Sequence, residues 1–187
     1  MENLQQWLHS ALSSSELEQA QGKYTRQGFS GEIGDVLPRN YIKHLYTIAG
    51  WFISQPVIAE KLLQKATSLA EKKEYTYLDK HHLYSEAIKI YYRHRTTEDF
   101  QIRAIKACVQ QIRIAPHTIR ELRRISDNSS LPTHTGYNQL ALILEEDKRY
   151  DNAIALCKQA IKQGWPDDWQ SRITHYQRQL SQQQLTT

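Results

Sequence analysis

Two amphipathic helical patterns follow one another closely in residues 133–164, and this stretch constrains the fold more than any other. In the first pattern, apolar residues recur three and four positions apart, at Tyr137, Leu140, Ala141 and Leu144. In the second, the same spacing holds for Ala153, Ile154, Cys157, Ala160 and Ile161. Such spacing places the apolar residues of each segment on one face of a helix. Gly164 follows the second pattern, where a C′ glycine would end the helix. The stretch therefore predicts a helical hairpin whose two apolar faces pack together.

This hairpin resembles the tetratricopeptide repeat (TPR), a unit of 34 residues built from two helices. The residues that carry the resemblance are Tyr137, Leu140, Ala141 and Leu144, followed by Tyr150, Ala153, Cys157 and Ala160. The sequence departs from the family pattern at two positions, because Cys157 replaces the usual aromatic residue and Pro166 falls one place late. The clear match covers about residues 134–167.

Helical patterns fill the rest of the chain, and no segment shows convincing strand alternation. With the TPR resemblance, this predicts an all-α, right-handed α-solenoid of TPR-like helical hairpins with additional N-terminal helices. We expect a single domain over residues 1–187. Its parts are a peripheral helical hairpin and loop (1–37), degenerate helical repeats (38–132), the TPR-like repeat with a capping helix (133–180) and a frayed tail (181–187).

Local signals predict where several helices begin. Ser13 and Glu16 have the spacing of a capping box, in which each side chain bonds the backbone of the other residue. Pro116 is predicted to start a short helix, because proline is favoured at the first helical position. Asp167 is predicted to cap the last helix, and residues 126–130 are predicted to form a loop.

The sequence contains no recognisable catalytic or metal-binding motif. His81 and His82 lie near Glu86, but without the spacing of a zinc motif we interpret them as part of a polar helix face. Cys108 and Cys157 fall on apolar helix faces, which predicts buried free thiols. We therefore expect no enzymatic activity, no cofactor and no metal.

Two further features bear on the compartment. No window approaches the roughly 18 apolar residues of a membrane span, and residues 1–3 do not resemble the start of a signal peptide. Free thiols are typical of a reducing compartment. We expect a cytoplasmic protein that does not bind membranes.

Positive charge is concentrated in residues 93–124, which contain eight Lys or Arg and three Asp or Glu. The rest of the chain has 16 basic and 17 acidic residues, so this segment accounts for the net charge of +4. The predicted basic face consists of Arg113, Arg120, Arg123 and Arg124. The apolar stripe opposite it consists of Ile119, Leu122 and Ile125. Such a face is interpreted as simply solvated, as a site for an acidic protein, or as a site for nucleic acid.

The TPR resemblance implies that a protein or peptide partner binds in a groove lined by the first helix of each repeat. The corresponding positions here are Thr135, Asn138, Gln139, Leu142, Glu145 and Glu146. The amides of Asn138 and Gln139 can hydrogen-bond an extended peptide backbone. TPR proteins that bind a C-terminal carboxylate carry lysines in this groove, whereas this sequence has acidic residues, so a carboxylate ligand is not expected there.

The favoured interpretation is a non-enzymatic adaptor that binds a protein or peptide through this groove, through the basic face, or through both. Two alternatives stay open. One is a nucleic-acid-associated regulator that uses the basic face, and the other is an inhibitory or immunity-type protein that occludes a toxin or an enzyme. Nothing in the sequence predicts an oligomeric state.

Overall fold

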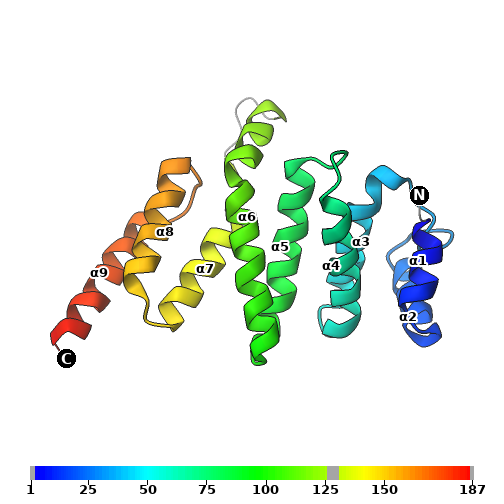
Figure 1. The fold of residues 1–187 in the computed structure, drawn as a ribbon, viewed down its shortest axis with the longest axis horizontal. Coiled ribbons are helices and arrows are strands. Elements are labelled where there is room, and N and C mark those ends of the chain that lie inside the picture. Colours follow the sequence, from blue (N-terminus) through cyan, green and yellow to red (C-terminus); the bar gives the residue numbers. More distant parts are fainter. Residues whose placement is uncertain (1–2, 126–130, 186–187) are drawn as a thin grey trace. The chain divides into compact units, whose positions relative to one another are not determined.

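The structure, a computed structural model, describes residues 3–125 and 131–185, so the predicted loop at 126–130 lies outside it. The described residues contain nine α-helices, one short 3-10 helix and no strand, which confirms the all-α prediction (Figure 1). Contacts between residues divide the chain into two compact units, Met1–Ala104 and Ile105–Thr187. The boundary falls within α6 (Glu98–Ile125), which therefore contributes residues to both units.

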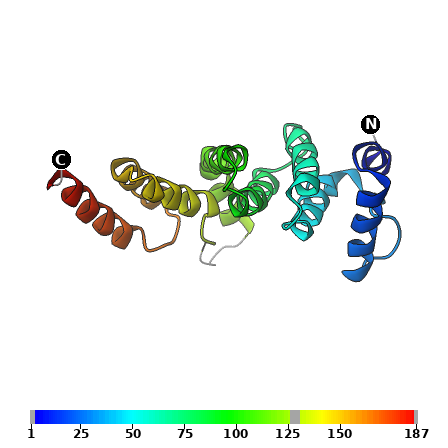
Figure 2. The ribbon, with the colours of Figure 1, turned by 90° about the horizontal axis from the view of Figure 1, so that it is seen from below.

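The first unit contains five complete α-helices and a 3-10 turn. Their bounds are α1 Leu4–Ala11, α2 Ser14–Arg26, η1 Pro38–Asn40, α3 Tyr41–Trp51, α4 Pro56–Ala70 and α5 Tyr77–Arg93. Helices α3, α4 and α5 pack against one another, and their fully buried residues include Leu45, Ile48, Leu62 and Leu83. Helices α1 and α2 cross at a steep angle (Figure 2). The buried apolar residues of α3, α4 and α5 thus form the core of this unit.

The predicted capping box at the start of α2 is confirmed. The Glu16 amide donates to Ser13 Oγ at 3.3 Å, and the Ser13 amide donates to Glu16 Oε2 at 2.8 Å. The same carboxylate accepts a hydrogen bond from Lys61 Nζ at 2.8 Å, which joins α4 to α2. The Lys61 hydrogen bond is the main cause that lowers the pKa of Glu16.

The glycine-rich loop after α2 packs on the helices that precede it. Gly28 and Gly31 have φ angles of 86° and 85°, a left-handed conformation that favours glycine. A Cβ atom on Gly34 would lie 2.5 Å from the Cα of Gln5 in α1, so only glycine fits there. Ile33 is buried. The loop is therefore an ordered covering of this end of the unit.

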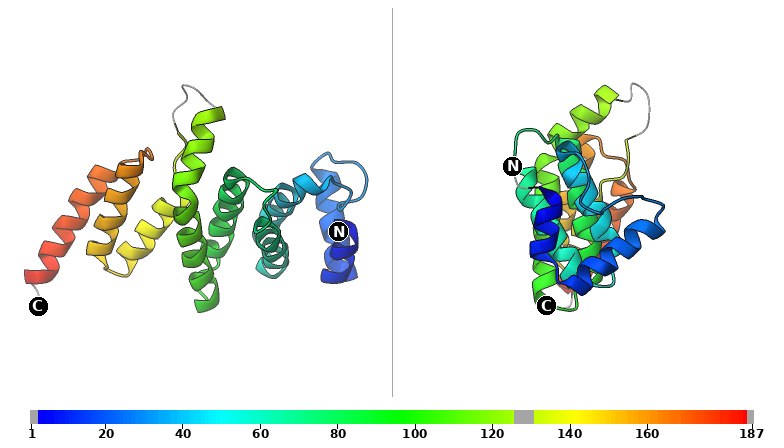
Figure 3. Two further views of the ribbon diagram at one scale, coloured as in Figure 1. Left: turned by 45° about the horizontal axis from the view of Figure 1, so that its top comes forward. Right: turned by 90° about the vertical axis from the view of Figure 1, so that its right-hand side faces the viewer.

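The second unit consists of the remainder of α6, α7 (Thr135–Glu146), α8 (Tyr150–Gln163) and α9 (Trp169–Leu185). Helix α8 packs against both α7 and α9 (Figures 1 and 3). The core of this unit includes Tyr137, Leu144, Ala153, Cys157, Ala160, Trp169 and Tyr176. The two apolar faces predicted in residues 133–164 therefore do pack together.

Pro116 does not begin a helix, contrary to the prediction. Helix α6 runs unbroken from Glu98 to Ile125 with this proline inside it. Pro116 is exposed, whereas Ala115 and Ile119 are buried in the core of the second unit. Because the residues on both sides of the proline pack on the same core, one helix continues through it.

Both ends of α9 also differ from the prediction. The Arg172 amide donates to the Asp168 carbonyl at 3.1 Å, so Asp168 rather than Asp167 immediately precedes the first turn. At the other end, residues 181–185 continue the helix, although they were predicted to fray. The final two residues lie outside the described part of the chain.

Candidate partner-binding surfaces

Buried polar side chains hold the start of α7 in place. His134 Nδ1 accepts a hydrogen bond from the Tyr137 amide at 3.2 Å, so His134 caps the helix. Gln111 Oε1 in α6 accepts a hydrogen bond from the Gly136 amide at 2.6 Å. Both His134 and Gln111 are fully buried. These bonds satisfy amides that the first turn of a helix leaves unpaired, and they position α7 against α6.

Gly136 allows α7 to approach α6 closely. A Cβ atom at this position would lie 2.7 Å from Gln111 Oε1 and 3.1 Å from the backbone oxygen of Cys108. The second of these neighbours is backbone, so it cannot rotate away. A side chain at position 136 would therefore displace one helix from the other.

Replacing Gly136 with alanine is expected to destabilise the second unit by about 1–3 kcal/mol, because overpacking a closed site forces shifts. Gly22→Ala in α2 is the matched control. Apart from its chain neighbours and the nearby backbone of its own helix, no heavy atom lies within 4 Å of a Cβ added at Gly22. Alanine there should be neutral, or stabilise by roughly 0.5–1 kcal/mol. Urea denaturation of the purified variants measures both changes, and an undiminished stability of Gly136→Ala would contradict the close approach of α7 and α6.

The six predicted groove residues share one side of α7. Leu142 and Glu146 are exposed, and Leu142 keeps 40% of its surface accessible. The half-buried members of the set are Thr135, Asn138, Gln139 and Glu145. The residues on the other side of the helix, which are buried, include Tyr137, Ala141 and Leu144. The helix thus presents a narrow strip that carries one apolar side chain and several polar ones.

Two neighbouring amides on this strip are incompletely hydrogen-bonded. Asn138 Oδ1 and Gln139 Nε2 are buried and have no hydrogen-bond partner among the described residues. Leaving a buried polar atom unpaired costs about 1–3 kcal/mol. Folded proteins pair the large majority of such atoms. A bound molecule toward which these side chains can turn would therefore lower the free energy of this surface.

Glu145 is already engaged within the unit. Its Oε1 lies 3.0 Å from His175 Nε2 in α9. Tyr176, which follows His175 in α9, is buried. Its burial and the negative charge of Glu145 raise the pKa of Tyr176 to about 12. Glu145 therefore links α7 to α9, a role that the sequence did not predict.

The four predicted basic residues are all exposed on the C-terminal half of α6. Arg113, Arg120 and Arg124 share one side of the helix with Lys106, over roughly 27 Å at 1.5 Å per residue. In the part of the chain that the structure describes, none of the four arginines forms an ion pair with an acidic side chain. The Nε of Arg120 donates to the Pro116 carbonyl at 3.1 Å. The charge of this face is therefore available to a partner.

Arg123 lies on a different side of α6 from the other three arginines. Its Nη2 would be 3.4 Å from a Cβ added at Gly164, which ends α8. A cation near the C-terminal end of a helix is stabilised by the partial negative charge there. Ile125, predicted to continue the buried stripe, is 71% exposed, so that stripe does not extend to the end of the described helix.

The buried cysteines and His81 are poor candidates for chemistry. The prediction of buried free thiols is confirmed for Cys108 and Cys157. Burial raises the pKa of Cys108 to about 12 and that of Cys157 to about 11, so both stay protonated at neutral pH. His81 is buried rather than part of a polar face, and burial lowers its pKa to about 4. No group of three His, Cys, Asp or Glu side chains within residues 3–125 and 131–185 is arranged to hold a metal ion.

Comparison with known proteins found no matching family model, no matching curated protein and no matching solved structure. None of the helices in the described residues is both long enough and apolar enough to cross a bilayer.

Proposed function

We propose that this protein is a non-enzymatic protein-binding module, built as a right-handed α-solenoid of TPR-like hairpins. In this arrangement α7 and α8 form the clearest repeat, and α9 covers its end. The packing of α8 against both neighbours supports the assignment. The partner is an extended segment of another protein, which lies along the strip of α7 where Leu142 and Glu146 are exposed. The pair of incompletely bonded amides at Asn138 and Gln139 is the observation that carries the proposal.

An extended polypeptide supplies the groups that these amides lack. Its backbone N–H donates to a carboxamide oxygen, and its C=O accepts from a carboxamide NH₂. Leu142 lies about one turn further along the helix and offers an apolar contact. Peptide grooves combine such main-chain bonds, which provide affinity, with side-chain contacts that provide specificity. The strip has both kinds of contact within one turn of α7.

The second candidate is a nucleic-acid-associated regulator, and the exposed arginines of α6 favour it. Their charges lack acidic partners within the described residues and extend along one helix. Arginines that contact phosphates release counterions from nucleic acid, so binding falls steeply as salt rises. Binding of an acidic protein segment to this face would also weaken as the salt concentration rises, but nuclease would not release such a partner.

Affinity purification from native lysate, with and without nuclease, separates these candidates. We expect the wild-type chain to retain a protein partner after nuclease treatment. Asn138→Ala with Gln139→Ala should reduce retention about tenfold, because each lost hydrogen bond contributes roughly 0.5–1.5 kcal/mol. Lys158→Ala with Gln159→Ala is the matched control, since both residues are exposed on α8. This control pair should leave retention unchanged.

A second variant tests the basic face in the same experiment. It carries Arg113→Glu, Arg120→Glu and Arg124→Glu, the three arginines that share one side of α6. One result would replace the proposal with nucleic-acid binding. In that case the wild-type chain would retain RNA or DNA at physiological salt, nuclease would abolish the retention, and this variant would lose it. The α7 changes would then have no effect. Nuclease-resistant retention that only the arginine changes abolish would place the protein partner on α6 and overturn its assignment to α7.

A further inference from the structure

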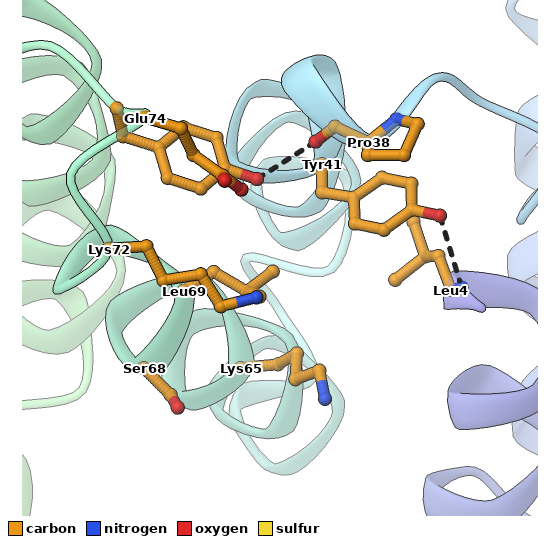
Figure 4. Close-up of a pocket in the computed structure, with 9 residues that line it drawn as sticks. Leu4, Pro38, Tyr41, Lys65, Ser68, Leu69, Lys72 and Glu74 are labelled. Carbon is orange, nitrogen blue, oxygen red and sulfur yellow. Dashed lines mark hydrogen bonds between the residues drawn. The ribbon is translucent and has the colours of Figure 1, made fainter. Parts of the chain in front are cut away.

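A small pocket in the first unit lies between α1, η1 and the end of α4 (Figure 4). Its volume is about 190 Å³. Sites for drug-sized ligands typically measure roughly 300–1,000 Å³, so this pocket suits a smaller molecule. Leu4 and Leu69, both buried, line its apolar side.

Hydrogen bonds between separate segments hold the walls of the pocket. The Tyr75 hydroxyl donates to the Pro38 carbonyl at 2.8 Å, which joins the segment after α4 to η1. The Leu4 amide donates to the Tyr41 hydroxyl oxygen at 3.5 Å, which joins α1 to α3 (Figure 4). Because that oxygen is the acceptor, the hydroxyl proton of Tyr41 can still be donated to a ligand. The pocket is therefore formed before any ligand binds.

Two lysines supply the charge of the pocket. Lys65 comes from α4, and its Nζ lies 5.2 Å from the centroid of the Trp7 ring, a cation–π contact that holds it near α1. Lys72 follows the end of α4, and its side chain extends toward the middle of the pocket (Figure 4). Lys72 forms no side-chain hydrogen bond or ion pair with any described residue. Ser68 also lines the pocket and adds a hydroxyl.

Acidic groups nearby limit what this basic pocket can accept. Glu74 lies on its lining, and Glu32 and Asp35 line an adjoining hollow that shares Tyr41 with it. These carboxylates repel a long polyanion, whereas a ligand with one anionic group can reach the lysines. We propose that the pocket binds a small organic anion, with a carboxylate or phosphate held by Lys65 and Lys72 and an apolar part lying on Leu4 and Leu69. This site is independent of the proposed partner surface on α7.

Titration of the full chain with phenyl phosphate, inorganic phosphate and phenol tests this proposal by NMR chemical-shift changes. Phenyl phosphate should bind saturably and more tightly than inorganic phosphate, because its ring covers the two leucines. Phenol, which lacks the anionic group, should not bind saturably. Lys72→Met should weaken the binding of phenyl phosphate about tenfold or more, since a charge-assisted hydrogen bond is lost.

Lys73→Met is the matched control, because Lys73 is exposed but does not line the pocket. It removes the same charge and should leave the affinity unchanged. Lys72→Arg, which keeps the charge, should retain most of the binding. Equal weakening by Lys72→Met and Lys73→Met would indicate diffuse attraction to positive charge and would overturn the site. Absence of saturable binding up to about 10 mM phenyl phosphate would overturn it as well.

Discussion

A chain that ends at Pro166, and so lacks α9, is expected to lose the folded structure of its second unit and to aggregate. Trp169, Ile173 and Tyr176 of α9 are each at most 4% exposed and belong to the core that α8 also forms. Burying one large apolar side chain stabilises a protein by about 1.5–3 kcal/mol. Three such losses approach the total stability of an ordinary domain, roughly 5–15 kcal/mol.

Circular dichroism and size-exclusion chromatography with light scattering measure this outcome. The matched control ends at Ser181, which keeps every residue of α9 that belongs to the buried core. The control should stay monomeric or keep the oligomeric state of the full chain. A chain ending at Pro166 that behaves in the same way, and loses only the helical signal of the deleted residues, would show that α9 is not an essential cover for α8.

Ala153→Phe is expected to cost about 1–3 kcal/mol of stability or more, because a large ring enters a packed core. Ala153 is fully buried in α8, within the core of the second unit. Ala155→Phe makes the same chemical change two residues away at an exposed position. A surface change of this kind usually stays within about 0.5 kcal/mol. Equal unfolding midpoints of the two variants in urea would mean that α7 and α8 do not pack through this face.

Signals that act between neighbouring residues were predicted correctly. Ser13 and Glu16 form their capping box because both partners belong to the same turn. Gly164 ends α8 with a φ of 84°, a conformation that glycine adopts without steric cost. Helical spacing also predicted the buried side of α7, where Tyr137, Ala141 and Leu144 share one face.

Features that depend on packing between distant segments were missed or predicted wrongly. Pro116 usually marks a helix start, but contacts on both sides of it keep α6 continuous. His134 caps α7, although histidine is not among the favoured capping residues. The contact between Glu145 and His175 joins residues 30 positions apart, and no pattern among neighbouring residues predicts it.

The two candidate sites show the same contrast between features of one helix and features that depend on distant segments. The strip on α7 was predicted from the TPR resemblance, which assigns groove positions along a single helix. The anion pocket was not predicted, because Leu4, Tyr41, Lys65 and Lys72 come from segments that only the tertiary fold brings together. Periodicity also failed at the end of α6, where Ile125 fits the apolar stripe but has no neighbouring element to cover it among the described residues.

Photo-crosslinking from the centre of the α7 strip tests the partner-binding proposal most directly. Benzoylphenylalanine placed at Leu142, which is 40% exposed, reports what contacts this surface in a native lysate. The same residue placed at the exposed Ala155 on α8 serves as the control. We expect a nuclease-resistant protein adduct from position 142. This adduct should be absent from position 155, and it should be lost when Asn138 and Gln139 are changed to alanine. No adduct at position 142, or one that is equally strong from position 155, would contradict the proposal.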